Sequence, residues 1–212
     1  MRERHPEIVC RKMTAKSYLL IYNVGKRQNF GQLLRSACAF GVTAIFIVGA
    51  EKLSTFGNQG TSLHCEFRHF PDIVAAKTYL VENRIKLVGI EIAEGAAAIE
   101  SHPFDGDTCF MLGNEGTGMN EQQMAACDSF VYVPQYSGAT ASLNVFIAGS
   151  IVMHHFAVWA GFSERQRSGQ KFVTEDGRGS LERFQNPTEW EKTEIERKRA
   201  DRAEKKLKVS DL

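Results

Sequence analysis

The chain has 212 residues, of which 43% are hydrophobic, 24% charged and 10% aromatic, and its formal net charge is +1. This composition excludes a collagen-like, a disulfide-scaffold and a wholly disordered protein, and the length suits one core with at most a small appendage. Residues 1–35 carry eight Lys or Arg against two acidic residues, whereas residues 87–164 carry nine acidic residues and no Lys or Arg. The basic N-terminal stretch predicts contact with a polyanion.

Between residues 18 and 162, short apolar runs alternate with segments of helical periodicity. Strands are predicted at 18–23, 44–48, 65–69, 87–92, 109–112 and 130–133, and helices at 30–40, 71–81, 121–127 and 143–159. Gly41 is placed to end the first helix, and Pro71 falls in the first turn of the second. Strands that alternate with helices predict an α/β fold with a mostly parallel sheet covered by helices on both faces.

Residues 145–162 form an uncharged stretch about as long as a membrane-spanning helix, which needs roughly 18–20 residues. His154 and His155 lie inside it, and Ser142, Asn144 and Ser150 lie near its start. Because the rest of the chain has the pattern of a globular α/β domain, we expect a buried helix and no membrane span. A helix that is apolar on most faces requires cover from a sheet, another helix or a second subunit.

Two flanking segments differ in character from residues 18–162. Residues 1–17 form a basic extension, and residues 163–212 form a charged tail in which residues 174–187 resemble a loop. From about residue 188 the tail is rich in helix formers, but its apolar residues make only a weak stripe. We expect either a marginal amphipathic helix that is exposed, docks on RNA or packs against the body, or a frayed, solvated tail.

The cysteines and the N-terminal residues bear on the compartment. Five cysteines, an odd number without a C-x-x-C pair, predict neither a disulfide framework nor a zinc ribbon. The start, MRERHPEIVCRKM, is charged where a secretory signal would be apolar, and Glu3 and Glu7 argue against a transit peptide. We expect a cytoplasmic or nuclear protein, with an organelle as the alternative.

Three segments rich in glycine and small polar residues follow predicted strands: NVGKRQNFGQLLR (23–35), LGNEGTGMN (112–120) and VPQYSGATASLNV (133–145). The carboxyl ends of parallel strands form the crevice where ligands bind, so these segments predict a ligand site. GNEGTG has the spacing G-x-x-G-x-G, which differs from the dinucleotide fingerprint, and the chain has no G-x-x-x-x-G-K-[ST] phosphate loop.

The same three segments, in this order, resemble the motifs of the SpoU family of RNA ribose 2′-O-methyltransferases, part of the SPOUT superfamily. The resemblance rests on Asn29 with Arg35 six positions on, then LGNEGTGM with CDSFVYVPQ, then SLNVFIAGSI, and it spans roughly residues 18–162. It implies an S-adenosylmethionine-dependent enzyme that methylates a ribose of tRNA or rRNA. It also implies a homodimer and a C-terminal trefoil knot, which the physics of chain topology would not propose.

The resemblance assigns residues to the methyl donor position by position. Main-chain groups of the second and third motifs are implied to hold S-adenosylmethionine, with Glu91 at the end of the preceding strand as a further contact. The implied main-chain contacts are Leu112, Gly113, Asn114, Val133, Gln135 and Leu143. Gln135 stands where many relatives have Met, which leaves the adenine-side contacts open.

The resemblance also implies the catalytic residues Arg35, Asn29, Glu115, Ser142 and Asn144. Arg35 would lie beside the ribose hydroxyl, and because a guanidinium is a poor base, we expect it to bind the target phosphate and stabilise the developing alkoxide. Glu115 would orient Arg35 or Asn29, and Ser142 and Asn144 would hydrogen-bond the ribose or fix the loop. The non-catalytic alternatives are a helix-surface ion pair for Arg35, a turn carboxylate for Glu115 and a helix N-cap for Asn29.

No metal site is predicted. His64 with His69, and the pair His154 and His155, lack a Cys, Asp or Glu at a spacing that would complete a ligand set, so we expect structural histidines. Cys127 is likewise expected in the core and not as a nucleophile.

RNA contact is expected from the basic flanks, because seven Lys or Arg between residues 2 and 27 can meet several phosphates. Substrate choice would then come from these extensions, the dimer surface or an accessory protein. Two alternative functions remain. A catalytically idle relative could bind RNA as an assembly factor, although Arg35, Glu115 and Ser142 argue against an idle site. A nicotinamide-dependent oxidoreductase would lack its early glycine fingerprint.

Overall fold

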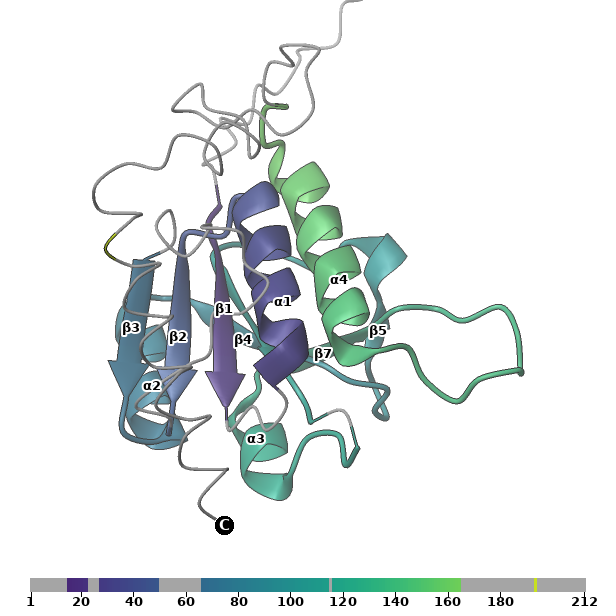
Figure 1. Cartoon of the computed structure of the whole chain (residues 1–212), viewed down its shortest axis with the longest axis horizontal. Helices are drawn as coiled ribbons and strands as arrows, with labels where there is room; N and C mark the ends of the chain where they lie inside the picture. The colour runs from purple at the N-terminus through teal and green to yellow at the C-terminus, as the bar shows by residue number, and fades with distance from the viewer. Residues whose placement is uncertain (1–14, 23–26, 50–65, 115, 165–192, 194–212) are drawn as a thin grey trace, which may run out of the picture. The chain divides into compact units, whose positions relative to one another are not determined.

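The computed structural model describes residues 15–22, 27–49, 66–114, 116–164 and 193 (Figure 1). The chain divides into two compact units, Met1–Phe162 and Ser163–Leu212. The elements of the first unit are, in chain order, β1 (Ser17–Tyr22), α1 (Arg27–Ala39), β2 (Ala44–Val48), β3 (Glu66–Phe70), α2 (Ile73–Glu82), β4 (Lys86–Ile90), β5 (Ala97–Ala98), the 3₁₀ helix η2 (Ile99–Ser101), β6 (Thr108–Leu112), α3 (Glu121–Ala126), β7 (Ser129–Tyr132) and α4 (Val145–Ala160).

Within the described residues, seven strands form one sheet in the order β3-β2-β1-β6-β4-β7-β5, and all neighbours pair in parallel. The strands β2 and β6 are buried along their whole length, as expected when helices cover both faces. The predicted parallel α/β fold is confirmed, and the six predicted strands agree with the observed ones to within two residues at each end. The strand β5 was not predicted, because two residues carry no periodic pattern.

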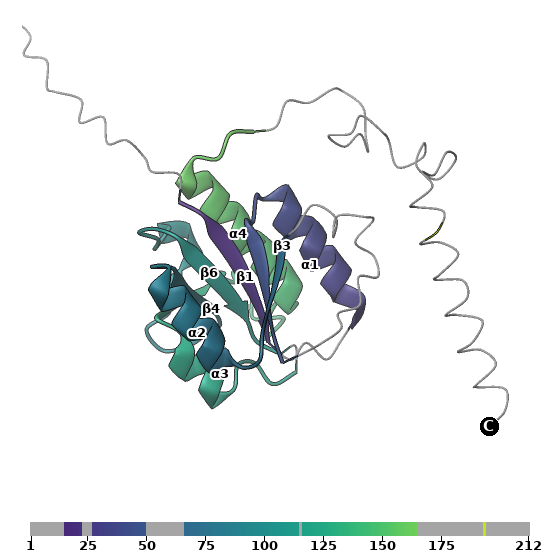
Figure 2. The ribbon, with the colours of Figure 1, turned by 90° about the vertical axis from the view of Figure 1, so that its left-hand side faces the viewer.

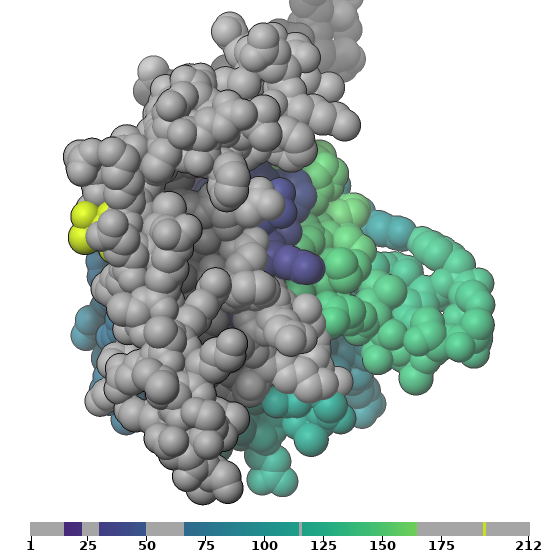
Figure 3. Space-filling view, in the orientation of Figure 1, coloured from purple at the N-terminus to yellow at the C-terminus, as the bar shows by residue number. Residues whose placement is uncertain are grey.

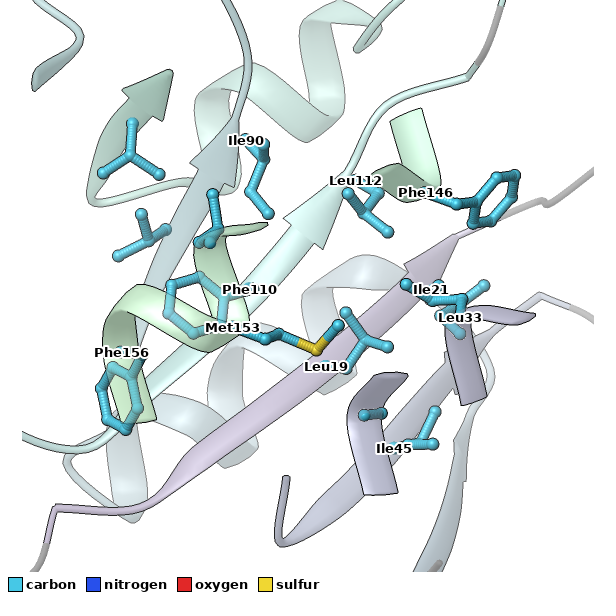
Figure 4. Close-up of a cluster of buried hydrophobic side chains, with 14 of the residues drawn as sticks. Leu19, Ile21, Leu33, Ile45, Ile90, Phe110, Leu112, Phe146, Met153 and Phe156 are labelled. Carbon is cyan, nitrogen blue, oxygen red and sulfur yellow. The ribbon is translucent and has the colours of Figure 1, made fainter. Parts of the chain in front are cut away.

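Helices enclose the sheet from both sides. Helices α1 and α4 lie side by side on one face, and α2 and α3 lie on the other (Figures 1 and 2). Side chains of β1 alternate between the faces: Leu19 and Ile21 join the core under α1 and α4, and Leu20 joins the core under α2. Figure 4 shows the first of these cores, in which Phe110 and Met153 lie together.

Helix α4 buries one face of the long apolar stretch and exposes the other. Ile147 and Val158 are 50% and 57% exposed. The buried positions recur at helical spacing and are Phe146, Gly149, Val152, Met153, Phe156 and Ala160. The expected burial of this helix is confirmed for the face that packs on the sheet and on α1, while the opposite face is exposed. Among the described residues, no helix has both the length and the apolar character needed to cross a membrane.

The N-terminal half of α4 approaches both β6 and α1 closely at Gly149. A Cβ on Gly149 would lie 3.1 Å from Leu112 Cδ2 and 3.4 Å from Leu33 Cδ1, so a larger residue would press α4 away from its neighbours. The adjacent Ser150 hydroxyl lies 2.8 Å from the Ser36 hydroxyl and joins α4 to α1. These contacts fix the end of α4 that faces the carboxyl edge of the sheet.

Two local expectations about helix starts are wrong. Helix α2 begins at Ile73 because the Asp72 side chain caps it, accepting a backbone N–H of the first turn at 2.8 Å, so Pro71 precedes the helix. Helix α1 begins at Arg27, which places Asn29 inside the first turn and excludes it as the N-cap. Apolar periodicity starts later than the helix itself in α1, so it could not locate the first turn.

The end of α1 and two of the cysteines agree with the sequence analysis. Gly41 follows α1 with a φ of +71°, a left-handed conformation that favours glycine. Cys109 and Cys127 are free thiols. Cys38 is disulfide-bonded, although the cysteine pattern predicted no disulfide framework.

Candidate functional site

A cavity of about 570 Å³ opens at the carboxyl ends of β4, β6 and β7. Ligands bind at this edge of open parallel sheets, and the volume falls within the usual range for small-molecule sites. The walls come from the three segments that follow these strands and from the first turn of α4. The lining residues are Ile90, Glu91, Ile92, Gly113, Asn114, Gly118, Tyr132, Val133, Gln135, Ser142, Leu143, Asn144, Val145 and Ala148.

The segment after β6 forms a tight turn that its own backbone holds. Asn114 and Gly118 exchange two backbone hydrogen bonds of 2.9 Å, and the Gly116 N–H donates to Asn114 Oδ1 at 2.8 Å. Gly118 has a φ of +70°, which residues with a side chain rarely adopt. The described residues of GNEGTG, all but Glu115, therefore form a compact turn that brings backbone to the cavity wall.

Glu91 joins the end of β4 to this turn. Its carboxylate accepts the N–H of Met119 through Oε2 and the N–H of Ile92 through Oε1, both at 3.1 Å. A Cβ on Gly113 would lie 2.8 Å from the Gly118 carbonyl carbon, and a Cβ on Gly118 would lie 2.9 Å from Glu91 Oε2. Both glycines are required for the turn to pack on Glu91 in this way.

The segment between β7 and α4 supplies the opposite wall. Asn144 is the N-cap of α4, and its Oδ1 accepts the backbone N–H of Phe146 at 3.0 Å and that of Ile147 at 3.3 Å. Ser142 and Leu143, which precede the cap, are exposed at the cavity. The cap thus anchors this wall to the start of a buried helix.

Gln135 carries an unpaired acceptor on the same wall. Its Oε1 is buried and has no hydrogen-bond partner among the described residues. Buried polar atoms are almost always hydrogen-bonded, so an orphaned carbonyl in a cavity wall indicates a ligand that offers an N–H or O–H donor.

The charge of the cavity comes from Glu91, because the lining residues in the described part of the chain include no other charged side chain. No Lys or Arg balances its carboxylate within that lining. An unbalanced carboxylate favours a cationic ligand over an anionic one.

Eight of the residues implied by the family resemblance meet at this one cavity. They are Glu91, Gly113, Asn114, Val133, Gln135, Ser142, Leu143 and Asn144. Leu112 is not in the lining, because its side chain is buried and packs under Gly149 of α4. The cavity therefore joins segments that are far apart in the sequence.

Of the remaining implied residues, only Arg35 has a described side chain. Arg35 is exposed on α1 and is not among the lining residues. Asn29 lies in the first turn of α1, and its side chain is outside the described part of the structure. Glu115 also lies outside the described residues. The structure thus brings the implied cofactor residues together without placing Arg35 beside them.

Six lining residues were not singled out from the sequence as site residues: Ile90, Ile92, Gly118, Tyr132, Val145 and Ala148. Gly118 had a signal, since it is the last glycine of GNEGTG. The others occupy strand ends or the first turn of α4, where an apolar residue carries no mark of a site. Their positions follow only from the packing of three strand ends.

The histidines of α4 are not among the cavity lining. The His154 ring meets the Phe40 ring edge-on at 5.4 Å, and His155 Nδ1 lies 3.0 Å from His102 Nε2. Burial, together with the nearby His102, lowers the pKa of His155. No group of three or more His, Cys, Asp or Glu in the described ranges could hold a metal ion, and His64 lies outside those ranges.

The contacts of Cys127 and Asp128 indicate structural roles for both residues. Burial raises the pKa of the Cys127 thiol to about 12, so it stays protonated at neutral pH and is a poor nucleophile. Asp128 accepts the Leu87 N–H at 2.8 Å and pairs with Lys77 Nζ at 2.7 Å. Cys127 is partly buried and packs against the core that contains the buried side chains of α2, which agrees with the expected structural role.

An α/β domain with a parallel sheet and a cavity at the ends of its central strands defines a broad class of ligand-binding proteins, and sequence comparison narrows it. The model of the SpoU rRNA Methylase family matches residues 16–154. The chain therefore belongs to the SpoU rRNA methylase family, which confirms the resemblance drawn from the three motifs.

Individual relatives agree with this assignment. The chain is 31% identical over 150 residues to the 23S rRNA (guanosine(2553)-2′-O)-methyltransferase of Bacillus subtilis, covering 67% of this chain and 58% of that protein. It is 26% identical over 155 residues to the tRNA (guanosine(18)-2′-O)-methyltransferase of Thermus thermophilus, covering 72% and 79%. The chain thus spans a little over half of the Bacillus protein.

The fold is similar to a solved SpoU structure. The SpoU methyltransferase AviRb from Streptomyces viridochromogenes, in complex with the cofactor AdoMet, superposes with a TM-score of 0.59 at 21% identity, covering 67% of this chain and 59% of that chain. At this identity the likeness identifies the fold.

Proposed function

We propose that this protein is an S-adenosylmethionine-dependent methyltransferase that acts on a ribose 2′-hydroxyl of tRNA or rRNA. The observation that carries the proposal is the cavity, because two of the three segments that match the SpoU motifs form its walls together with Glu91. The relatives, a 23S rRNA and a tRNA 2′-O-methyltransferase, support the reaction and the substrate class.

The cavity residues fit S-adenosylmethionine in charge and in hydrogen bonding. The sulfonium and ammonium groups of this molecule are cationic, which suits the carboxylate of Glu91, and its N–H groups can donate to the orphaned Gln135 Oε1. Main-chain groups of Gly113, Val133 and Leu143 would hold the rest of the molecule. When bound, it supplies an activated methyl group on sulfur.

The residues of the chain have the task of positioning the ribose. The 2′-hydroxyl must lie in line with the methyl group and lose its proton as the new bond forms. Ser142, exposed at the cavity, would hydrogen-bond the ribose, while Asn144 would fix the loop through its cap on α4. Arg35 would bind the target phosphate and stabilise the developing alkoxide, with Glu115 orienting it, and the proton would leave through a phosphate oxygen or water.

We also propose a homodimer in which the exposed side of α4 is covered. Ile147 and Val158 are 50% and 57% exposed there, and Leu143 at the cavity is 37% exposed. Apolar side chains aligned on one helix face are typical of an interface. A monomer in sedimentation experiments at micromolar concentration would overturn this part of the proposal. Substrate choice by an accessory protein, and a cytoplasmic or nuclear location, also remain proposals.

The trefoil knot implied by the resemblance is a further part of the proposal, supported by the similarity of the fold to a SpoU structure. The knot would thread the chain between β6 and α4, where both cavity walls originate. A crystal structure of the full chain with an unthreaded backbone in this region would contradict it.

Methyl transfer from labelled S-adenosylmethionine to unmodified tRNA and rRNA tests the proposed reaction. The RNA would be digested to nucleosides and searched for 2′-O-methylation, with Arg35→Ala and Arg35→Lys in parallel. We expect ribose-methylated product with the wild type and a large loss with both variants, because Lys cannot offer the planar fork of Arg. Near-full activity of Arg35→Lys would exclude the positioning role.

Two other outcomes would favour the alternatives. Binding of S-adenosylmethionine without transfer to any RNA would favour the idle RNA-binding assembly factor. Binding of a nicotinamide cofactor in place of S-adenosylmethionine would favour the oxidoreductase. Neither alternative is favoured by the names of the relatives.

A further inference from the structure

The loop that follows the Gln135 wall is tied to a distant segment by one exposed tyrosine. Residues 136–141, between Gln135 and Ser142, are all exposed, and Figures 1 and 3 show the loop standing out beside α4. Within it, Ala139 N–H donates to Ser137 Oγ and Thr140 Oγ1 donates to the Ser142 carbonyl, which are contacts inside the loop. Tyr136, at the start of the loop, instead donates its hydroxyl to Glu100 Oε1 on η2.

Glu100 sits on a platform that is fixed on three sides. Immediately before it, Ile99 is 1% exposed in the core, and β5 pairs with β7 through Ala98 and Tyr132. Just after it, His102 Nε2 lies 3.0 Å from His155 Nδ1 on α4. A hydrogen bond to Glu100 therefore ties a side chain to a segment that is itself held by the sheet edge and by α4.

The hydrogen bond from the Tyr136 hydroxyl to Glu100 matters because the Tyr136 side chain has little other packing to fix its position. Its side chain is 86% exposed, so burial does not fix it, yet the hydrogen bond from its hydroxyl to Glu100 raises its pKa. The residue before it in the chain is Gln135, whose buried Oε1 lacks a partner. Fixing Tyr136 on η2 limits the backbone freedom of the neighbouring Gln135, which is part of the cavity lining.

We propose that Tyr136 and Glu100 form a latch that positions Gln135, so that the Gln135 side-chain carbonyl accepts a hydrogen bond from an amino group of the bound cofactor. The inference rests on the proposed function, since it assumes that S-adenosylmethionine occupies the cavity. Tyr136 and Glu100 are positioning residues, and Gln135 is the residue that touches the ligand and determines its specificity. The latch holds this acceptor in place before the ligand arrives, which reduces the ordering cost of binding.

A binding cycle on the full chain tests the latch. Dissociation constants for S-adenosylmethionine would be measured by calorimetry for the wild type, Tyr136→Phe, Gln135→Met and the double variant. We expect each single variant to bind about fivefold more weakly, the usual effect of losing one hydrogen bond. The double variant should bind about as weakly as Gln135→Met alone, because the latch has nothing to position once the carbonyl is absent.

The latch also predicts which kinetic constant moves and which variant rescues it. Tyr136→Phe should raise the KM for S-adenosylmethionine about fivefold and leave kcat close to that of the wild type. Glu100→Gln, which keeps an acceptor for the Tyr136 hydroxyl, should retain most of the affinity that Glu100→Ala loses. Tyr79→Phe is the matched control, because Tyr79 lies on α2 against Phe46 on the other face of the sheet and should change nothing.

A second measurement separates failure of the latch from failure of the proposed function. Hydrogen exchange without any cofactor should be faster at amides 133–144 in Tyr136→Phe than in Tyr79→Phe, whereas thermal unfolding of the two should agree. Unchanged exchange, unchanged affinity of Tyr136→Phe, or an affinity loss in the double variant equal to the product of the single losses would overturn the latch. Absence of S-adenosylmethionine binding by the wild type, with the exchange difference present, would overturn the proposed function and the ligand role of Gln135.

Discussion

The strand β6 and the turn that follows it are adjacent in the sequence but are specified in different ways. All five residues of β6 are buried, and side chains from both helical layers pack against them. The described residues of the turn from Gly113 to Met119 are half-buried or exposed, and its shape comes from backbone hydrogen bonds, a positive φ and the carboxylate of Glu91. Substitutions in the strand should therefore act on stability, and substitutions in the turn should act on the cavity.

The same division recurs at the neighbouring strands. Strand β4 is buried from Leu87 to Ile90, and the next residue is Glu91 at the cavity. Strand β7 pairs with β4, and the segment that follows it carries Gln135 and ends at the Asn144 cap. In this domain, buried strands thus support a cavity wall whose geometry depends on few side chains.

The largest effect is expected inside β6, from Phe110→Ala. Phe110 is fully buried, with its ring centroid 5.6 Å from that of Phe156 and 5.7 Å from that of Phe104. Its loss leaves a cavity between sheet and helices and should lower the free energy of unfolding by about 3–5 kcal/mol. Chemical denaturation measures the change. Val74→Ala, at a 69% exposed position on α2, is the control, and a loss for Phe110→Ala below that of this control would contradict the division.

A smaller change in stability but a loss of binding is expected in the turn, from Gly113→Val. Its Cβ would lie 2.8 Å from the Gly118 carbonyl carbon, which forces the turn away from Glu91. The free energy of unfolding should fall by about 1–3 kcal/mol, as for other overpacked sites, while affinity for S-adenosylmethionine falls at least about tenfold. Gly138→Ala is the matched control, because a Cβ there meets no atom within 4 Å. Normal affinity of Gly113→Val would show that the turn does not shape the site.

A still smaller change in stability is expected at the cap of α4, where two substitutions separate the capping oxygen of Asn144 from its side-chain amide. Asn144→Ala removes the acceptor of the Phe146 and Ile147 N–H groups and should cost about 1 kcal/mol of unfolding free energy. Asn144→Asp keeps a capping oxygen, so its stability should remain close to that of the wild type. Methyl transfer measured on both variants then reports the role of the side-chain amide apart from the cap. Equal stability of the Ala variant and the wild type would argue against the cap.

The smallest effect is expected in the pH dependence of stability, through His155 on α4, which contacts His102. Burial and His102 lower the pKa of His155 below its ordinary value of 6.5, with His154 acting in the same direction and Glu100 opposing it. The unfolded chain therefore binds a proton before the folded one, so this contribution is present above pH 6.5 and is lost as the pH falls through the lower folded value. Thermal unfolding between pH 8 and pH 5 should decline less steeply for His155→Gln than for the wild type. Parallel profiles would contradict this role of the pair.

Regular elements could be predicted well because their patterns are local. The apolar runs located six of the seven strands in the described residues, and Gly41 marked the end of α1. The errors lie where a local pattern is too short or a side chain competes with it. The strand β5 has only two residues, and the Asp72 cap moved the start of α2 beyond Pro71.

The sequence by itself determined the fold class, the three segments at the strand ends and, through their motifs, the family. It could do so because hydrophobic period, glycine content and motif order are properties of neighbouring residues. Only the tertiary structure decided that Glu91, Gly113, Gln135 and Asn144 share one cavity, that Leu112 lies beneath it, and that Tyr136 meets Glu100. Tyr136 and Glu100 are 36 positions apart, and His102 and His155, which also meet, are 53 positions apart. No local pattern encodes the strand order that brings such residues together.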